Sequence, residues 1–438
     1  MATKRVLVIT YYWPPAAGPG VQRFLKFCKY LRDFDWEPIV LTVENGSYSS
    51  RDSSLEKDIP EGTKVYKTKT FEPFQIYNHL RGQKGKEIPV SLMGIKEDKR
   101  FIQKLSILIR ANFFVPDARK GWKPFAVKKA KKLISEYSIN AIITTGPPQS
   151  THLIGRELKK EFGIPWVADF RDPWTTVFYN KFFPRTKKTQ KKDRNLEDAV
   201  LSECDAITVV SNGLSKEFED RAKKIEVIYN GFDEADLPEK TQINSDTFSL
   251  EYIGNLKPNQ NVEALYDAIS ELKNENTSFS EDFKLNFTGN VDAYLMEKMC
   301  NSYGLKSLVQ VLPYVPHQEA VNRMSKSNML LFIIPRAENN RLIITGKLFE
   351  YMASGTPILS IGPIDGDASL LIKEGKRGTM LDYKDKEGIK ATLKQQYLLW
   401  KEQNGRKVFH EEDGLEQFSR RELTRKLSKV LNSAIGDE

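Results

Sequence analysis

The sequence predicts an α/β protein of two domains, each built on a parallel sheet that helices cover on both faces. Its 438 residues are too many for one typical core and suit two domains. Along the chain, apolar β-branched runs alternate with amphipathic stretches, which is the pattern of strand–helix–strand units. The alternation falls into two series that a polar segment separates. Continuous apolar runs such as Val6–Ile9 agree with strands buried on both faces.

The first series predicts an N-terminal domain over residues 1–231. Helical patterns lie between most of its strands, for example at Val21–Asp33, Phe125–Tyr137 and Thr151–Phe162. The segment 72–122 interrupts the alternation and mixes Lys and Arg with apolar residues, so we interpret it as an insertion and a candidate for function. The expected strands are Arg5–Thr10, Pro38–Val43, Val65–Lys69, Ala141–Thr145, Trp166–Phe170, Ala206–Val210 and Ile225–Tyr229.

The second series follows Asn230-Gly231 and predicts a C-terminal domain over residues 247–404. Residues 232–246 are polar and contain Pro238, so we interpret them as the linker between the domains. Residues 405–438 form a helical region, with its helix at roughly Leu415–Ser433, which we expect to pack back on the N-terminal domain. The expected strands are Phe248–Ile253, Lys284–Thr288, Val309–Leu312, Met329–Ile334, Pro357–Ile361 and Thr379–Asp382.

Composition favours a cytoplasmic protein without a membrane span. No window approaches 18 uninterrupted apolar residues, and the start MATKRVLVIT lacks the apolar stretch of a secretory signal. The three cysteines (Cys28, Cys204, Cys300) are far apart, and the four histidines are equally scattered. This spacing argues against a disulfide framework or a zinc site.

Positive charge is concentrated in the N-terminal half. Residues 1–240 contain 42 Lys and Arg against 31 Asp and Glu, a net charge of +11, whereas the remainder has a net charge of −2. Phosphorylated ligands, an anionic membrane surface and nucleic acid are all partners compatible with such charge. A nucleic-acid-binding protein is disfavoured because the sequence shows neither a basic stripe with stacking aromatics nor a known module.

A glycine-rich turn, Tyr11–Gly20, follows the first expected strand and precedes a helix. In doubly wound sheets, ligands bind at the carboxyl ends of strands, so Gly18 and Gly20 would let a phosphate or sugar approach the helix amides. Arg23, three residues further on, is a candidate substrate contact. Arg23 stands where a third glycine would complete GxGxxG, which argues against a dinucleotide-dependent oxidoreductase. The alternative interpretation is a tight turn without a ligand.

The segment Gly346–Pro357 predicts a loop, a helix and then a strand. Lys347 would stand at the helix start, where the dipole and free amides favour a diphosphate. Glu350 would lie one turn further, and its carboxylate suits the vicinal hydroxyls of a ribose. The alternative is a surface Lys–Glu pair on one helix face.

The segment Gly346–Pro357 also resembles the donor-binding signature of retaining glycosyltransferases of the glycogen-synthase-like, family-four type. The resemblance spans nearly the whole chain, with further motifs in the family's order at Pro14–Arg23, Ala168–Trp174, Val210–Gly213, Asn230–Asp233 and Tyr252–Leu256. It implies two Rossmann-like, doubly wound parallel-sheet domains that face each other across a cleft, the GT-B fold.

The resemblance further implies transfer of a sugar from a nucleoside-diphosphate sugar to a glycan or lipid-linked acceptor, with retention of configuration, in cell-surface polysaccharide biosynthesis. The C-terminal domain would hold the nucleotide, and the N-terminal domain would hold the acceptor. We expect no cofactor beyond the donor and no metal. Catalysis would come from positioning both substrates and from stabilising the leaving diphosphate with amides and Lys347.

The sequence departs from the family pattern at several donor-site positions. The family's first glutamate would fall at Leu342, and Glu338 lies four residues too early. Asn255 and Gln260 replace a family arginine and lysine, and Asn255 is still a candidate donor contact. Candidate substitutes for the lost positive charge, and further donor contacts, are Lys257, Arg336, Arg341, Gly346 and Lys347.

Several other residues are weaker candidates. Arg171 and Asp172 follow a strand, so Asp172 would hold an acceptor or donor-sugar hydroxyl, or instead pair with Arg171 or cap a turn. Asp365-Gly366-Asp367 looks like a metal-binding DxD motif, but its place favours a cap on the helix 368–374. Tyr314 would line the base pocket, and the four histidines are interpreted as structural or surface residues.

Two rival functions remain open on the sequence. A sugar-nucleotide epimerase can share this fold, and the missing glutamate at Leu342 is compatible with a non-catalytic binding module. A peripheral membrane contact is also expected, because basic and apolar residues alternate over Lys96–Phe114 and Phe178–Arg185, and four lysines follow at 187, 188, 191 and 192. The alternative for these segments is a solvated face.

Overall fold

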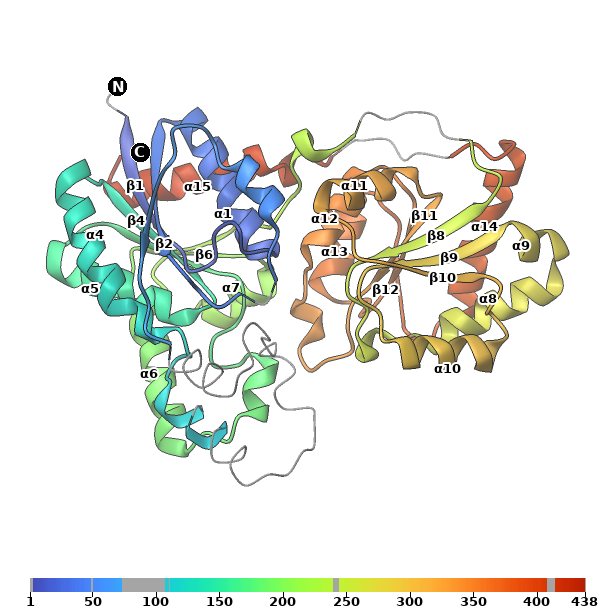
Figure 1. Cartoon of the computed structure of the whole chain (residues 1–438), viewed down its shortest axis with the longest axis horizontal. Coiled ribbons are helices and arrows are strands. Elements are labelled where there is room, and N and C mark those ends of the chain that lie inside the picture. The colour runs from blue at the N-terminus through green and yellow to red at the C-terminus, as the bar shows by residue number, and fades with distance from the viewer. Residues whose placement is uncertain are drawn as a thin grey trace. The chain divides into compact units, whose positions relative to one another are not determined.

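The computed structural model describes residues 3–48, 50–72, 107–109, 111–238, 244–407 and 414–437. The chain divides into two compact units (Figure 1). Unit 1 contains Met1–Tyr229 and Arg420–Glu438, and unit 2 contains Asn230–Ser419. The last helix, α15 (Arg420–Ile435), therefore belongs to unit 1 although it follows unit 2 in the sequence.

Unit 1 is built on a seven-stranded parallel sheet with the order β3-β2-β1-β4-β5-β6-β7. One apolar cluster packs helices α4, α5, α6 and α7 against the sheet, and a second cluster packs α1 and α15. The strands are β1 (Lys4–Ile9), β2 (Trp36–Val43), β3 (Lys64–Thr68), β4 (Ala141–Gly146), β5 (Trp166–Phe170), β6 (Ala206–Val209) and β7 (Ile225–Val227). The helices are α1 (Pro19–Tyr30), α4 (Lys123–Tyr137), α5 (His152–Phe162), α6 (Lys187–Glu203) and α7 (Asn212–Phe218).

Helix α15 completes the apolar cluster around α1. Its residues Leu423, Leu427 and Val430 recur at helical spacing and are buried in the same cluster as Phe24 of α1. Burying such side chains is the main force that holds a helix on a sheet. The C-terminal end of the chain is thus part of the core of the N-terminal unit.

Unit 2 is built on a six-stranded parallel sheet with the order β10-β9-β8-β11-β12-β13. Its apolar cluster joins the sheet to helices α8, α9, α10 and α14. The strands are β8 (Phe248–Ile253), β9 (Phe283–Thr288), β10 (Val309–Leu312), β11 (Met329–Ile333), β12 (Ile358–Ile361) and β13 (Met380–Leu381). The helices are α8 (Glu263–Glu275), α9 (Thr277–Asp282), α10 (Ala293–Tyr303), α11 (His317–Lys326), α12 (Gly346–Ala353), α13 (Asp367–Glu374) and α14 (Lys386–Glu402).

The predicted fold class is confirmed, since every expected strand is present with ends that move by at most two residues. Helix α1 begins at Pro19, a favoured first position, and ends at Tyr30, where a 3₁₀ turn follows. The last helix begins at Arg420 instead of Leu415 because residues 416–418 form a 3₁₀ turn. Most of the expected insertion, residues 73–106 and 110, lies outside the described residues.

A buried ion pair joins helix α1 to the centre of the unit 1 sheet. The Arg23 guanidinium donates to Asp169 Oδ1 from Nη2 at 2.8 Å and to the Tyr229 carbonyl oxygen at 2.8 Å. The Asp169 carboxylate also accepts from the hydroxyls of Thr145 and Thr208. Burial alone would raise the pKa of Asp169, but Arg23 and the hydroxyl of Thr208 outweigh burial and lower it.

Replacing Asp169 with Asn should lower the free energy of unfolding by about 3–5 kcal/mol, because it leaves the buried charge of Arg23 without its counterion. The measurement is urea unfolding followed by circular dichroism. Glu203→Gln is the matched control: it breaks the part-exposed Arg156–Glu203 pair, which should contribute only about 0–1 kcal/mol. Equal effects of the two substitutions would contradict a special role for the buried pair.

The contribution of Asp169 to stability depends on pH. Because its pKa is lowered in the folded protein, the Asp169 carboxylate stabilises the fold above the ordinary carboxyl pKa, and this stabilisation is lost as the pH falls.

Candidate functional site

The strand order of unit 2 reverses between β8 and β11, and the loops that follow these two strands begin at the same edge of the sheet. Ligands of doubly wound sheets bind at such a reversal, outside the carboxyl ends of the strands. Gly254 follows β8 directly, and helix α12 begins at Gly346 after the loop that follows β11. The segment that the sequence singled out is therefore placed where a ligand can bind.

Lys347 lies in the first turn of α12 and reaches back to the end of β8. Its Nζ donates to the Ile253 carbonyl oxygen at 2.9 Å and to the Tyr252 hydroxyl at 3.2 Å, and it lies 4.3 Å from the centroid of the Tyr252 ring. Burial lowers the pKa of Lys347 to about 8, although nearby Glu350 opposes this shift. Neutral oxygens thus hold the Lys347 amine at a helix N-terminus. An anion there would be stabilised both by the positive amine and by the free N–H groups of the helix.

Gly254 makes room for this lysine. Its φ of +124° lies in the region that favours glycine, and a Cβ at this position would lie 2.8 Å from Lys347 Nζ. Gly289, which follows β9, in turn lets the chain pass close to Gly254, because a Cβ there would lie 2.5 Å from the Gly254 carbonyl oxygen. Close backbone approach at two neighbouring strand ends is what a phosphate-binding edge requires.

Glu350 lies one turn further along α12, half-buried. His317, the first residue of α11, places its Nε2 3.9 Å from Glu350 Oε1 and 3.5 Å from Asp236 Oδ2. The sequence placed Glu350 in the site, but it treated His317 only as a structural or surface histidine. The signal that could have found it is its position: like Gly346, it opens a helix after a strand of the same sheet.

Two residues that replace family charges have structural contacts. Gln260 is buried, and its Nε2 donates to the Ile333 carbonyl oxygen at 2.9 Å and to the Tyr252 hydroxyl at 3.2 Å. The carbonyl oxygen of Asn255 accepts from the same Tyr252 hydroxyl at 3.0 Å, and the backbone N–H of Lys257 donates to Gln260 Oε1 at 3.2 Å. These bonds hold Tyr252 below Lys347, so this part of the site is an ordered platform.

Arg341 and Asp365 form an exposed ion pair at 2.8 Å, with 67% and 59% of their side chains exposed. The expected cap on α13 is wrong, because Gly366 is the N-cap, no side chain caps the helix, and Asp365 pairs with Arg341 instead. Tyr314 lies two residues after β10 and is 62% exposed. Within the described ranges, no three His, Cys, Asp or Glu side chains gather as metal ligands.

The glycine-rich turn of unit 1 is organised around Arg171. Gly18 is the N-cap of α1 with a φ of +119°, and a Cβ at Gly20 would lie 1.4 Å from Arg171 Nη1. Arg171 donates from Nε to the Gly146 carbonyl oxygen at 3.1 Å. Asp172 is exposed beside it. Gly18, Gly20, Arg171 and Asp172 therefore gather at the carboxyl edge of the unit 1 sheet.

Arg23 does not join this group. The sequence suggested a substrate contact for it, but its side chain is 0% exposed, and its guanidinium is engaged by Asp169 and the Tyr229 carbonyl. The residue is one helical turn past Gly20, on the side of α1 that faces the sheet. Its observed contacts hold the helix in place and offer no surface to a substrate.

Two family models match the chain over most of its length. One, described as Glycosyltransferase Family 4, matches residues 75–236, and the other, Glycosyl transferases group 1, matches residues 247–397. Together these ranges cover well over half of the chain. No curated protein sequence matches it.

Solved structures share the fold over nearly the whole chain at low identity. Sucrose-phosphate synthase from Thermosynechococcus elongatus is 14% identical, with a TM-score of 0.61, over 99% of this chain and 100% of its own. The lipopolysaccharide outer core galactosyltransferase WaaB, in its apo form, is 14% identical, with a TM-score of 0.55, over 98% and 99%. A protein from Listeria monocytogenes assigned as a UDP-N-acetylglucosamine 2-epimerase is 11% identical, with a TM-score of 0.55, over 100% and 98%.

Likeness at such identities shows the fold alone, whereas the family models speak to the activity. Both family models describe glycosyltransferases: the first matches β4 to β7 of unit 1, and the second covers the whole sheet of unit 2. The chain therefore belongs to glycosyltransferase family 4: it is an enzyme with the GT-B fold that transfers a sugar from a nucleotide-sugar donor.

Proposed function

We propose that unit 2 binds the donor diphosphate through Lys347 and the amides at the start of α12, and the donor ribose through Glu350. The observation that carries this proposal is the position of Lys347 Nζ at the carboxyl end of β8, where its hydrogen-bond partners among the described residues are a carbonyl oxygen and a hydroxyl oxygen. The hydroxyl oxygen of Thr345, at the N-cap of the same helix, is buried without a hydrogen-bond partner among the described residues. A phosphate oxygen would satisfy both groups.

The proposed reaction retains the configuration of the transferred sugar. The bond between the anomeric carbon and the diphosphate oxygen breaks, the acceptor hydroxyl oxygen forms the new bond on the same face, and its proton passes to the departing diphosphate. Lys347 and the α12 amides would stabilise the negative charge that develops on the leaving group. Asp172 of unit 1 would position a substrate hydroxyl. We propose that this transfer needs no divalent metal, so activity should survive EDTA.

Calorimetric titration with UDP, GDP, ADP and CDP, and with their sugars, tests the donor site. One nucleotide should bind the intact chain, and Glu350→Ala should weaken its affinity by about 10–150-fold, because a hydrogen bond to a charged group contributes about 1.5–3 kcal/mol. Glu374→Ala is the matched control: this exposed glutamate ends α13, which runs back to the opposite edge of the sheet. Unchanged nucleotide affinity in Glu350→Ala would reject the ribose contact. Turnover of the sugar nucleotide without an acceptor would favour the epimerase alternative.

Donor affinity should fall as the pH rises from 7 to 9.5. The pKa of Lys347 is about 8, so the amine is charged below this pH and loses its proton above it. If the bound diphosphate keeps the amine protonated, the loss reaches about 30-fold at pH 9.5. Lys347→Arg, which stays charged over this range, should give a flat profile. A wild-type profile that is equally flat would show that the charge of Lys347 does not hold the donor.

We further propose that unit 1 docks on an anionic membrane and that the acceptor is lipid-linked. Exposed apolar side chains (Leu108, Ile109, Phe113, Phe178, Phe182) lie in the same region as the start of α6. Asn112 connects these segments, donating from Nδ2 to the Pro184 carbonyl oxygen and accepting from the Thr186 N–H at 2.8 Å. The lysines at 187, 188, 191 and 192 are all exposed. In the described part of the chain, no helix is long and apolar enough to cross a membrane.

Co-sedimentation with liposomes tests this surface. Binding should increase with anionic lipid, decrease with salt, and weaken strongly when the four lysines at 187, 188, 191 and 192 are changed to Ser, because each contributes about 1 kcal/mol near such a surface. The control changes four exposed lysines of unit 2, at 298, 306, 326 and 376, and removes the same charge. Equal sedimentation with and without anionic lipid would refute membrane docking and favour a soluble acceptor.

A further inference from the structure

Unit 1 contains a cavity of about 260 Å³ at the carboxyl edge of its sheet. Its walls include Tyr12, after β1, Gln149, after β4, and Trp174, after β5. The strand order of unit 1 reverses between β1 and β4, so the cavity lies at the reversal where doubly wound sheets bind ligands. Its volume is below the roughly 300–1,000 Å³ of drug-sized ligand sites, so it suits a single ring and excludes a longer chain of sugars.

Each charged side chain that lines the cavity already has a hydrogen-bond or ion-pair partner. Asp193 accepts from Trp174 Nε1 at 2.9 Å and pairs with Arg185. Asp117 accepts from the N–H and the hydroxyl of Ser150 at 2.7 and 2.8 Å, and Arg119 pairs with Glu72 at 3.0 Å. Both arginines among the described lining residues are paired, so neither offers an open positive charge to a phosphate or a carboxylate. The cavity therefore suits a ligand without charge.

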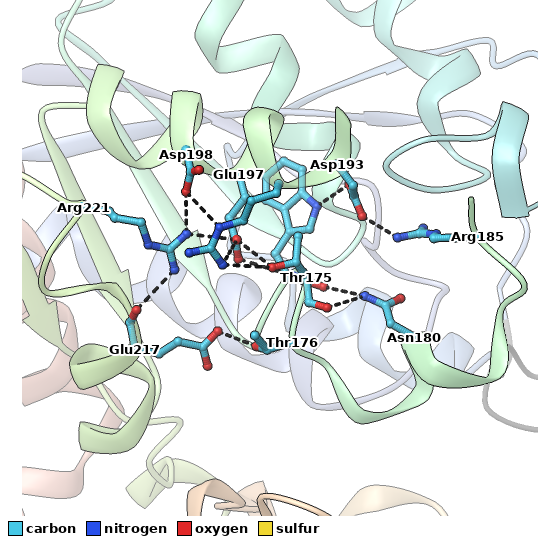
Figure 2. A network of polar contacts seen from close by, with 11 residues as sticks. Thr175, Thr176, Asn180, Arg185, Asp193, Glu197, Asp198, Glu217 and Arg221 are labelled. Atoms are coloured by element: carbon cyan, nitrogen blue, oxygen red, sulfur yellow. Dashed lines mark hydrogen bonds and ion pairs between the residues drawn. The ribbon is translucent and has the colours of Figure 1, made fainter. Parts of the chain in front are cut away.

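Figure 2 shows the polar contacts that hold the segment after β5 against α6. Asp193 of α6 lies between Arg185 and the indole of Trp174, and Asn180 donates from Nδ2 to the Trp174 and Thr175 carbonyl oxygens at 3.0 Å. Glu197, the next turn of α6, accepts from the Thr175 hydroxyl at 2.8 Å. The segment after β5 is thus tied to α6 at several points, so the aromatic wall is preorganised.

Neutral polar groups in the wall are left without partners. Gln149 is only 8% exposed, its Oε1 is buried without a hydrogen-bond partner, and its amide makes no side-chain hydrogen bond with any described residue. His152 lies behind it: burial lowers its pKa to about 3, so the ring is neutral at physiological pH, and its Nε2 also lacks a partner in the described structure. A ligand can reach the amide through Nε2, so an acyl chain would leave its N–H groups unsatisfied, whereas the oxygens of ring hydroxyls would accept from them.

We infer that this cavity binds one neutral pyranose ring of the acceptor, with an apolar face of the ring against the part-exposed aromatic side chains of the wall (Tyr12, Phe114, Phe183) and its hydroxyls bonded to Gln149. The aromatic walls match the C–H faces of a sugar, and the unpartnered amide matches its hydroxyls. The assignment of this ring to the acceptor rests on the proposed function. The binding of the ring itself does not.

Saturation-transfer NMR on the full chain tests the inference with the methyl pyranosides of glucose, galactose, mannose and N-acetylglucosamine. At least one should bind, and Gln149→Leu should weaken it by about 2–13-fold, as expected for one lost neutral hydrogen bond. Ala118→Leu, which fills the cavity from another wall, should abolish binding. Octanol and inorganic phosphate are the comparison probes. Binding of either of these in place of every glycoside, or no glycoside binding at all, would overturn the inference, as would a glycoside affinity that both variants leave unchanged.

Thermal stability separates a ligand-binding amide from a structural one. Gln149→Leu removes an unpartnered buried oxygen, so its Tm should stay the same or rise. Gln260→Leu is the matched control, because Gln260 is equally buried but fully hydrogen-bonded, so its Tm should fall while glycoside binding persists. A fall in the Tm of Gln149→Leu as large as that of Gln260→Leu would count against a binding role. Glycoside binding should also persist in Glu350→Ala, so failure of the donor site and failure of this cavity are distinguishable.

Discussion

The position of every candidate site follows from one reversal of strand order in each unit. In each unit, the second and third strands lie on one side of the first strand, and the fourth strand lies on its other side. The loops after these two central strands leave in opposite directions, and the space between them is walled by backbone amides and strand-end side chains. Gly254 in unit 2 and Tyr12 and Gln149 in unit 1 occupy these places, although very different residues precede and follow them.

Within this common frame, the partner of a cation decides what the cation can do. Arg23 is paired with the Asp169 carboxylate inside the core, and this ion pair holds α1 to the sheet. Lys347 and Arg171 are held by carbonyl oxygens at strand ends, and glycines at positions 254 and 20 make room for them. A carbonyl orients a cation without cancelling its charge, so these two groups keep electrostatic attraction for an anionic ligand.

Much of the fold could be predicted from the sequence, because buried parallel strands are short, continuous apolar runs whose signal is local. The segment Gly346–Pro357 was recognisable for the same reason, since Lys347 and Glu350 are spaced along one helix. What sequence reasoning missed depends on distant partners. Nothing near Arg23 in the sequence reveals that its buried side chain pairs with Asp169, 146 residues away. Gln260 looked like a lost charge, yet it supports the Tyr252 ring, and nothing local marks Gln149 as an amide without a partner.

The structure also shows where part of the excess positive charge of the first 240 residues lies. The arginines that line the unit 1 cavity are paired with carboxylates, so their positive charge is balanced within the wall. The lysines at the start of α6 are exposed, so they carry part of the excess on the outer surface. A cavity that recognises a ring by hydrogen bonds and a surface that recognises lipid by charge respond differently to salt, since screening weakens exposed charges far more than buried hydrogen bonds. If the acceptor is lipid-linked, as proposed, unit 1 would bind its sugar part and its membrane part by two independent kinds of interaction.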